Sequence, residues 1–264
     1  MSVVRLETAG QAENLSPAIW ADYPSVKAIM DPSQVIDIFD DFVDPVVADT
    51  SVPNWEFTGT NGDVDNSADE PNGVILLEGS GADNDSATIM KNDLYLLARS
   101  SGKRFWFEAR VKLAAAGTAD DFAAFVGLAE SVAGTAELIA DDGATIIDED
   151  HIGFKAITNA TTIGDWDATV NIGGSANFPV DIEADTAETT TSWVKLGMKF
   201  DGKKTVTFFV DGVKTTSYDV TNLDSYTMLH ELTVVIGVKD CEAAQLGLYV
   251  DWVRFACEKN ANGS

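Results

Sequence analysis

The sequence predicts an all-β protein, a jelly-roll sandwich of two antiparallel sheets that follows a short N-terminal arm. Three observations indicate this fold class. Short runs of alternating apolar and polar residues fill the chain from Val35 onward, Asn-, Asp- and Gly-rich turns separate them, and two Asp-Gly turns lie close together near the C-terminal third. Alternation with a period of two is typical of a strand with one buried and one solvated face. Many short strands of this kind favour a sandwich or a jelly roll.

The arm comprises residues 1–34. Ser16-Pro17 and Ser25 predict the starts of two short helical turns, because Ser caps free N–H groups and Pro suits the first helical position. Pro24 and Pro32 exclude one long helix. The arm is too apolar for a free tail, so we expect it to dock either on its own sandwich or on a neighbouring subunit. The side chains that we expect to anchor it are Ile19, Trp20, Tyr23 and Ile29.

The sandwich is expected over residues 35–258, with a C-terminal tail at 259–264. Arg104 to Leu113 alternates cleanly, which predicts a half-buried strand. The other expected strands are Val35–Phe42, Trp55–Thr58, Gly73–Glu78, Ala87–Lys91, Asp121–Glu130, His151–Ile157, Trp166–Ile172, Leu232–Val238 and Leu246–Cys257.

Residues 193–217 predict three strands joined by the turns Asp201-Gly202 and Asp211-Gly212. Asp-Gly between β-rich runs is a strong hairpin signal, because tight hairpin turns need positive φ angles that Gly tolerates. In the first of these strands, Val194, Leu196, Met198 and Phe200 share one face, and Trp193, Lys195, Gly197 and Lys199 share the other.

Composition limits the partners. The 264 residues hold 17 Lys and Arg against 43 Asp and Glu, a net charge of −26. Such a surface repels phosphate backbones and anionic bilayers, so we expect no nucleic-acid or membrane partner. The first residues lack the apolar core of a secretory signal, which predicts a protein made in the host cytoplasm. With two cysteines and two histidines the chain predicts no disulfide scaffold, zinc site or cofactor.

Three segments resemble the concanavalin A-like lectin/glucanase sandwich, the fold of laminin-G-like modules and family 16 glycoside hydrolases. They are Ile38-Phe39-Asp40-Asp41-Phe42 followed by Trp55, the Trp193 hairpin, and the closing Leu248-Tyr249-Val250-Asp251-Trp252-Val253-Arg254-Phe255. The resemblance covers about Val35 to Cys257 and implies this fold.

The resemblance also directs attention to catalytic acids, because family 16 glucanases carry E-x-D-x-x-E on one strand. A retaining glycosidase needs two carboxylates about 5 to 5.5 Å apart. In the comparable segment Asp148 and Asp150 have the spacing of the first two acids, but Gly153 replaces the last. A literal match occurs later, at Glu183, Asp185 and Glu188, without flanking apolar residues. We therefore expect no catalytic residues.

Two acidic loops and three tryptophans are the remaining binding candidates. Residues 60–70 and 79–86 are dense in Asp, Asn and Gly, which suits either calcium or plain solvated turns, and we favour the turns and expect no metal. Trp106, Trp166 and Trp193 fall on or near the polar faces of their strands, where they either form a glycan platform or pack against the arm or another subunit.

An apolar arm, an acidic lectin-like body and no catalytic acids together resemble bacteriophage virion proteins. The sequence thus predicts a non-enzymatic structural virion protein that decorates or cements a capsid. We expect it to be homo-oligomeric and to bind the major capsid protein or another virion protein. The alternative is a carbohydrate-binding module that recognises a surface glycan, and a family 16-like glycosidase is the least favoured interpretation.

Overall fold

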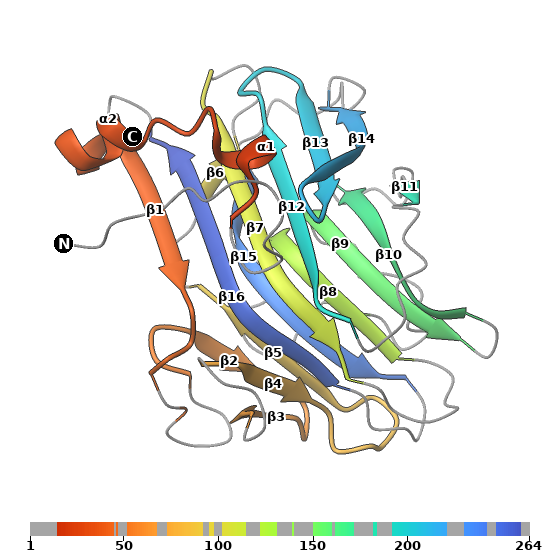
Figure 1. Cartoon of the computed structure of the whole chain (residues 1–264). Coiled ribbons are helices and arrows are strands. Elements are labelled where there is room, and N and C mark those ends of the chain that lie inside the picture. The colour runs from red at the N-terminus through yellow and green to blue at the C-terminus, as the bar shows by residue number, and fades with distance from the viewer. Residues whose placement is uncertain are drawn as a thin grey trace.

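The computed structural model describes residues 15–44, 46, 52–67, 73–91, 95–97, 102–114, 122–130, 139, 150–159, 162–171, 182–183, 192–220, 230–241 and 247–259. These residues form two layers of antiparallel strands, and their helical elements all lie in the arm (Figure 1). No helix among them combines the length and the apolar character needed to cross a bilayer. The predicted all-β sandwich of two antiparallel sheets is confirmed.

The elements follow one another from the arm to the last strand. The arm holds α1 (Pro17–Trp20), α2 (Ser25–Met30) and the 3-10 turn η1 (Pro32–Gln34). The strands are β1 (Val35–Asp40), β2 (Glu56–Thr58), β3 (Asp63–Asn66), β4 (Ile75–Glu78), β5 (Ser86–Met90), β6 (Tyr95–Leu97), β7 (Phe105–Leu113), β8 (Phe122–Ala129), β9 (His151–Asn159), β10 (Thr162–Asn171), β11 (Ile182–Glu183), β12 (Val194–Phe200), β13 (Thr205–Val210), β14 (Val213–Asp219), β15 (His230–Asp240) and β16 (Gly247–Glu258).

Each sheet has eight strands in the described part of the chain. The first runs β14-β13-β12-β7-β16-β4-β3, and β1 pairs with the far end of β16. The second runs β11-β10-β9-β8-β15-β5-β2, and β6 pairs with β15. The first and last strands of the sandwich, β1 and β16, therefore lie side by side in the first sheet (Figure 1).

The core lies between the two sheets and follows from the alternation in the sequence. In β7, Phe107, Ala109 and Val111 point inward and are fully buried, as are Ile152 and Phe154 of β9 from the facing sheet. A fully buried aliphatic or aromatic side chain contributes about 1.5–3 kcal/mol of transfer free energy. This repeated alternation is what makes the two-layer sandwich stable.

The hairpin β13–β14 shows why the Asp-Gly signal is reliable. Asp211 and Gly212 both have positive φ angles, 49° and 76°, as a type I′ turn requires. Most predicted strands appear with shifts of a residue or two at their ends, and the first strand ends at Asp40 rather than at Phe42. The exception is β10, which begins at Thr162, four residues before the predicted Trp166. Three short strands were not predicted, β3, β6 and β11, because runs of two to four residues are too short to show a period.

Candidate functional site: the arm-docking face of the first sheet

The outer face of the first sheet carries the most developed side-chain constellation among the described residues. Since the odd-numbered residues of β7 fill the core, Trp106, Glu108, Arg110 and Lys112 point outward. The strand register places their partners beside them in rows across β16, β7 and β12. These rows are Ala256–Trp106–Lys199, Arg254–Glu108–Gly197 and Trp252–Arg110–Lys195, and Tyr249 lies beside Lys112.

Helix α1 docks on the first two of these rows. Ile19 is fully buried and fits over Gly197, where an added Cβ would lie only 2.2 Å from the Ile19 Cδ1 atom. A side chain at position 197 would therefore force the Ile19 side chain to move. Trp20 is 6% exposed and packs with Trp106 and Phe209 in a cluster separate from the main core.

Glu108 is a buried carboxylate beneath the arm. Its Oε2 accepts hydrogen bonds from the Ser16 backbone N–H at 2.9 Å and from Trp20 Nε1 at 2.8 Å. The side chain is fully buried, and its Oε1 has no hydrogen-bond partner among the described residues. Burial raises the pKa of Glu108, although the two arm hydrogen bonds and the nearby Lys195 oppose that rise. Among the described residues, the hydrogen-bond donors to this carboxylate thus both come from the arm.

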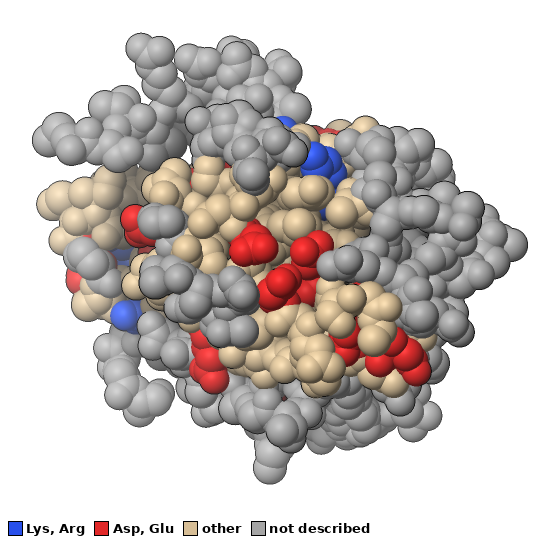
Figure 2. Space-filling model, turned by 90° about the horizontal axis from the view of Figure 1, so that it is seen from below, with Lys and Arg blue, Asp and Glu red and all other residues tan. Residues whose placement is uncertain are grey.

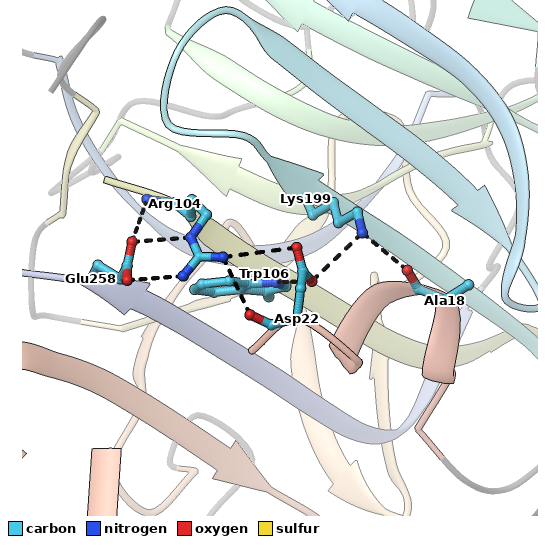
Figure 3. Close-up of polar contacts among 6 residues, drawn as sticks. All are labelled: Ala18, Asp22, Arg104, Trp106, Lys199 and Glu258. Carbon is cyan, nitrogen blue, oxygen red and sulfur yellow. Dashed lines mark hydrogen bonds and ion pairs between the residues drawn. The ribbon is translucent and has the colours of Figure 1, made fainter. Parts of the chain in front are cut away.

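Asp22 extends the contact beyond α1 (Figure 3). It accepts a hydrogen bond from Trp106 Nε1 at 3.0 Å and lies 3.6 Å from Lys199 Nζ, which also donates to the Ala18 carbonyl at 3.1 Å. Arg104 donates to the Asp22 carbonyl at 3.3 Å and forms a two-pronged ion pair with Glu258. The arm is therefore fixed to β7 and β12 by polar contacts as well as by apolar packing, and Arg104 links it to Glu258 of β16.

Tyr23 and Arg254 lie at the edge of the arm–sheet contact nearest β1. The Tyr23 ring packs edge-on against both Trp20 and Trp106, with centroids 5.7 and 5.4 Å apart. Its hydroxyl donates to Asp37, and burial together with this carboxylate raises the pKa of Tyr23. The Arg254 guanidinium lies 4.5 Å from the Trp20 ring centroid while it pairs with Asp37. Cation–π contacts of this kind are worth about 0.5–2 kcal/mol.

These contacts decide between the two docking surfaces that the sequence left open. Ile19, Trp20 and Tyr23 anchor the arm on its own sandwich. Ile29 does not anchor the arm on this sandwich, because it is 79% exposed, and its contact with a neighbouring subunit stays a prediction. Val26 and Met30 share its side of α2 and are 74% and 79% exposed, and no residue of α2 is buried.

The predicted glycan platform is wrong for two of its three tryptophans. Trp106 is 1% exposed because the arm covers it, and Trp166 is 2% exposed because its side chain lies in the core between the sheets. Trp193 alone remains half-buried at the surface. Lys112 Nζ lies between its ring and that of Tyr249, 4.8 and 4.5 Å from the two centroids, and Arg110 lies 4.6 Å from the Trp193 centroid.

Strand β9 of the second sheet follows the segment that the resemblance compares with the catalytic segment of the glucanases. Ile152, Phe154 and Ala156 of β9 fill the core, so His151, Gly153 and Lys155 point to the other side. His151 Nε2 lies 3.0 Å from Thr169 Oγ1, and its ring packs edge-on against Phe125. None of these three outward positions carries a carboxylate.

The candidate acids are placed as follows. Asp150 is buried at the start of β9. In the later motif, Glu183 belongs to β11 and pairs with Asp167 of β10. Asp148, Asp185 and Glu188 lie outside the described residues.

Acidic residues gather at the end of the sandwich formed by β3, β4 and β5 (Figure 2). Oxygen atoms of Asp63, Asp65 and Glu78 lie within 4.8 Å of one another. Burial raises the pKa of Glu78, and the charges of Asp63 and Asp65 raise it further. In the second acidic loop, Asp85 is buried and accepts hydrogen bonds from Ala82 of the same loop and from Asn61 of the first loop.

Comparisons with known proteins agree with this architecture. No family model and no curated protein matches the sequence. Among solved structures, the carbohydrate recognition domain of Emp47p superposes with a TM-score of 0.56 at 11% identity, over 85% of this chain and 97% of that one. The endo-1,3-beta-glucanase from Streptomyces sioyaensis gives 0.56 at 13% identity, over 87% and 98%. A protein of unknown function from Shewanella oneidensis MR-1 gives 0.56 at 18% identity, over 88% and 90%.

The chain has the concanavalin A-like lectin/glucanase fold. The likeness extends over most of each chain, so the sandwich predicted from the hairpin and the closing strand is confirmed. At sequence identities this low, the similarity to these structures shows a shared fold only. The sequence left two alternatives for the face that carries Trp106, a glycan platform or packing against the arm or another subunit, and the structure shows the arm packed on it. The alternation marks the face as polar and solvated, so it could not show which segment covers it.

Proposed function

We propose that this protein is a non-enzymatic structural protein that attaches to a larger assembly, and that the assembly is a virion. The observation that carries the proposal is the exposed apolar face of α2, formed by Val26, Ile29 and Met30. Phe39 and Val43, at 55% and 62% exposure, add apolar surface along and after β1. Apolar side chains exposed together at one part of a surface are typical of protein–protein contacts.

The chemistry of the partner follows from charge. The chain carries a net charge of −26, and Asp31 and Asp44 lie exposed after α2 and after β1, next to these apolar residues, whereas Asp37 is already paired with Arg254. A partner that buries Val26, Ile29 and Met30 must tolerate or neutralise these acids, so we propose a surface with an apolar centre and Lys or Arg around it. A capsid protein or another virion protein is the partner that the lectin-like body and its arm suggest.

The absence of carboxylates on the outward positions of β9 supports a non-enzymatic role. A two-carboxylate mechanism needs acids that face the sugar from one site. At these positions His151 carries an imidazole, Gly153 has no side chain, and Lys155 carries an ammonium group. We therefore propose no hydrolase function for this face.

The test is recovery of the native particle or complex from cells that make the protein, followed by mass spectrometry of its components. We expect a virion protein in stoichiometric amount. The double variant Val26→Asp/Ile29→Asp should leave the sandwich folded and remove the chain from the particle. Val213→Asp is the matched control, because Val213 is 67% exposed on β14, a strand at the opposite edge of the first sheet. Recovery of the double variant on the particle would refute the proposed surface.

Carbohydrate binding is the second candidate, and the row Trp193–Lys112–Tyr249 favours it. Half-exposed rings suit stacking on a sugar, and the ammonium group between them suits a carboxylate or sulfate substituent. We expect any glycan bound here to be acidic. Binding measured on a panel of neutral and acidic glycans, lost in Trp193→Ala and Lys112→Gln but kept in Lys214→Gln on β14, would establish this role.

A further inference from the structure

We infer that the outer face of the first sheet binds an oligosaccharide with a single acidic sugar and excludes a chain that carries an acidic group on every sugar. This inference rests on carbohydrate binding, the second candidate function above, and names the class of ligand that fits that site. The evidence is a row of side chains that crosses the sheet and changes from cationic to acidic along its length.

The strand register defines this cross-strand row. Lys112 of β7 lies opposite Tyr249 of β16, which lies opposite Leu76 of β4, which lies opposite Asp65 of β3. Trp193 extends the row on the other side of Lys112, because the pairing of β12 with β7 begins at the next residue. The residues beside each of these five along the chain fill the core, so the five side chains lie on the outer face, where none is fully buried.

The middle of the row is a shallow apolar floor. The ring centroids of Trp193 and Tyr249 are 6.5 Å apart. Leu76 lies against Gly247, where an added Cβ would be only 2.6 Å from the Leu76 Cδ1 atom. Aromatic and aliphatic side chains suit the C–H faces of sugar rings. From β12 to β4 the floor extends over about 14 Å, since neighbouring strands lie about 4.8 Å apart, and it is therefore longer than one sugar ring.

The cationic part of the row is Lys112. Its Nζ atom lies 4.8 Å from the Trp193 ring centroid and 4.5 Å from that of Tyr249, so the ammonium group is held within the floor. Arg110 also lies beside Trp193, but its guanidinium already pairs with Asp251. Lys112 is therefore the cation that we expect to receive the carboxylate of a bound sugar.

The other end of the row is negatively charged. Asp65 belongs to an acidic trio with Asp63 and Glu78, whose oxygen atoms lie within 4.8 Å of one another at the acidic end of the sandwich (Figure 2). Burial raises the pKa of Glu78, and the charges of Asp63 and Asp65 raise it further. The trio thus already repels its own charges, and a further anion bound there would be unfavourable.

The spacing of the strands separates the two ends. From Lys112 on β7 to Asp65 on β3 is three strand spacings, about 14 Å, which exceeds the Debye length of about 8 Å at physiological ionic strength. A carboxylate bound at Lys112 is therefore screened from the trio. A second carboxylate over Leu76 would lie one strand from Asp65 and would be repelled. The row accordingly selects one acidic sugar followed by neutral ones.

The test measures binding of oligosaccharides of equal length to the full chain by isothermal titration calorimetry. The first is a neutral chain that ends in a single sialic acid, the second ends in a neutral sugar instead, and the third is an oligosialic acid. We expect the first to bind about tenfold more tightly than the second, the effect of one hydrogen bond to a charged group. The third should bind most weakly.

Variants at the two ends should change different ligands. Lys112→Gln should lower the affinity for the first oligosaccharide to that of the second and leave the second unchanged. Asp65→Asn/Glu78→Gln should strengthen the binding of oligosialic acid about tenfold, because it removes two nearby negative charges, and should leave the first unchanged. Lys214→Gln on β14 is the matched control and should alter none of the three.

The outcomes separate this inference from carbohydrate binding itself. If oligosialic acid binds as tightly as the first oligosaccharide, or gains nothing from Asp65→Asn/Glu78→Gln, the selection for one acidic sugar is overturned while carbohydrate binding stands. If none of the three oligosaccharides binds, the second candidate function is refuted and the inference falls with it.

Discussion

Replacement of Glu108 by Gln tests how a buried carboxylate governs the docking of the arm. Glu108 is fully buried and takes its two hydrogen bonds from Ser16 and Trp20. Gln keeps a carbonyl oxygen that accepts both bonds, and its NH2 group takes the place of Oε1, which has no hydrogen-bond partner among the described residues. The variant therefore preserves shape and accepted bonds while it removes the ionisable proton.

The sign of the effect follows from the raised pKa of Glu108. In the unfolded chain the carboxyl group loses its proton near its ordinary pKa, whereas in the folded chain it keeps that proton to higher pH. Between these two pKa values the folded state binds more protons, so its stability falls as pH rises. The stabilisation is complete below the unfolded pKa and is lost as pH rises through the folded pKa.

The difference in unfolding free energy between the natural chain and Glu108→Gln reports the titration of Glu108, because the other acids are the same in both proteins. Near pH 4.5 the protonated Glu and the Gln amide are alike, so we expect similar free energies of unfolding. Above that pH the variant should become the more stable protein, by up to about 1.4 kcal/mol for each pH unit until the folded pKa is passed. The gain cannot exceed the free energy of docking the arm, because release of the arm returns Glu108 to water.

The assay is urea unfolding followed by tryptophan fluorescence, repeated at several pH values between 4.5 and 8. Three cations surround Glu108: Arg254 and Lys195 in the neighbouring strands and Arg110 along β7. If the variant loses stability relative to the natural chain as pH rises, these cations and the two arm bonds outweigh burial. That result would refute the reasoning.

Four other predictions concern the arm, the sheet faces and the acidic end. Trp20→Ala should lower the free energy of unfolding by about 3 kcal/mol, because it removes a buried ring and a donor to Glu108, whereas Val213→Ala on exposed β14 should change it little. Gly197→Ala should weaken the docking of α1 and so speed trypsin cleavage at Lys27, which is already exposed on α2, and the pairing Gly197→Ala/Ile19→Ala should slow it again; equal cleavage of both would contradict the close fit. No turnover is expected on β-glucans or galactans, and turnover abolished by Glu183→Gln would overturn that expectation. Calcium chloride and sodium chloride at matched ionic strength should raise the melting temperature by the same amount. A larger rise with calcium that disappears in Asp63→Asn would instead establish a metal site at Asp63, Asp65 and Glu78.

The sequence by itself determined the strands, their faces and the sandwich. Val194, Leu196, Met198 and Phe200 alternate with polar residues, and this alternation can be satisfied only if one side is buried. The Asp-Gly turns then fix how neighbouring strands join. These are local signals, carried by residues a few positions apart, so they can be read before the fold is known.

The tertiary structure alone decided what covers each polar face. Trp106 alternates as a surface residue does, yet the arm buries it, because Ser16 and Trp20 meet the neighbouring Glu108 from 92 and 88 residues away. The polar pattern of β10 suggested a surface Trp166, but the register of β10 against β9 turns its ring into the core. Similarly, Ile29 is as apolar as Ile19, and only the position of α2 beyond the sheet leaves it exposed. Contacts between segments this far apart produce no periodic pattern in the sequence. The docking face could therefore be identified only from the tertiary structure.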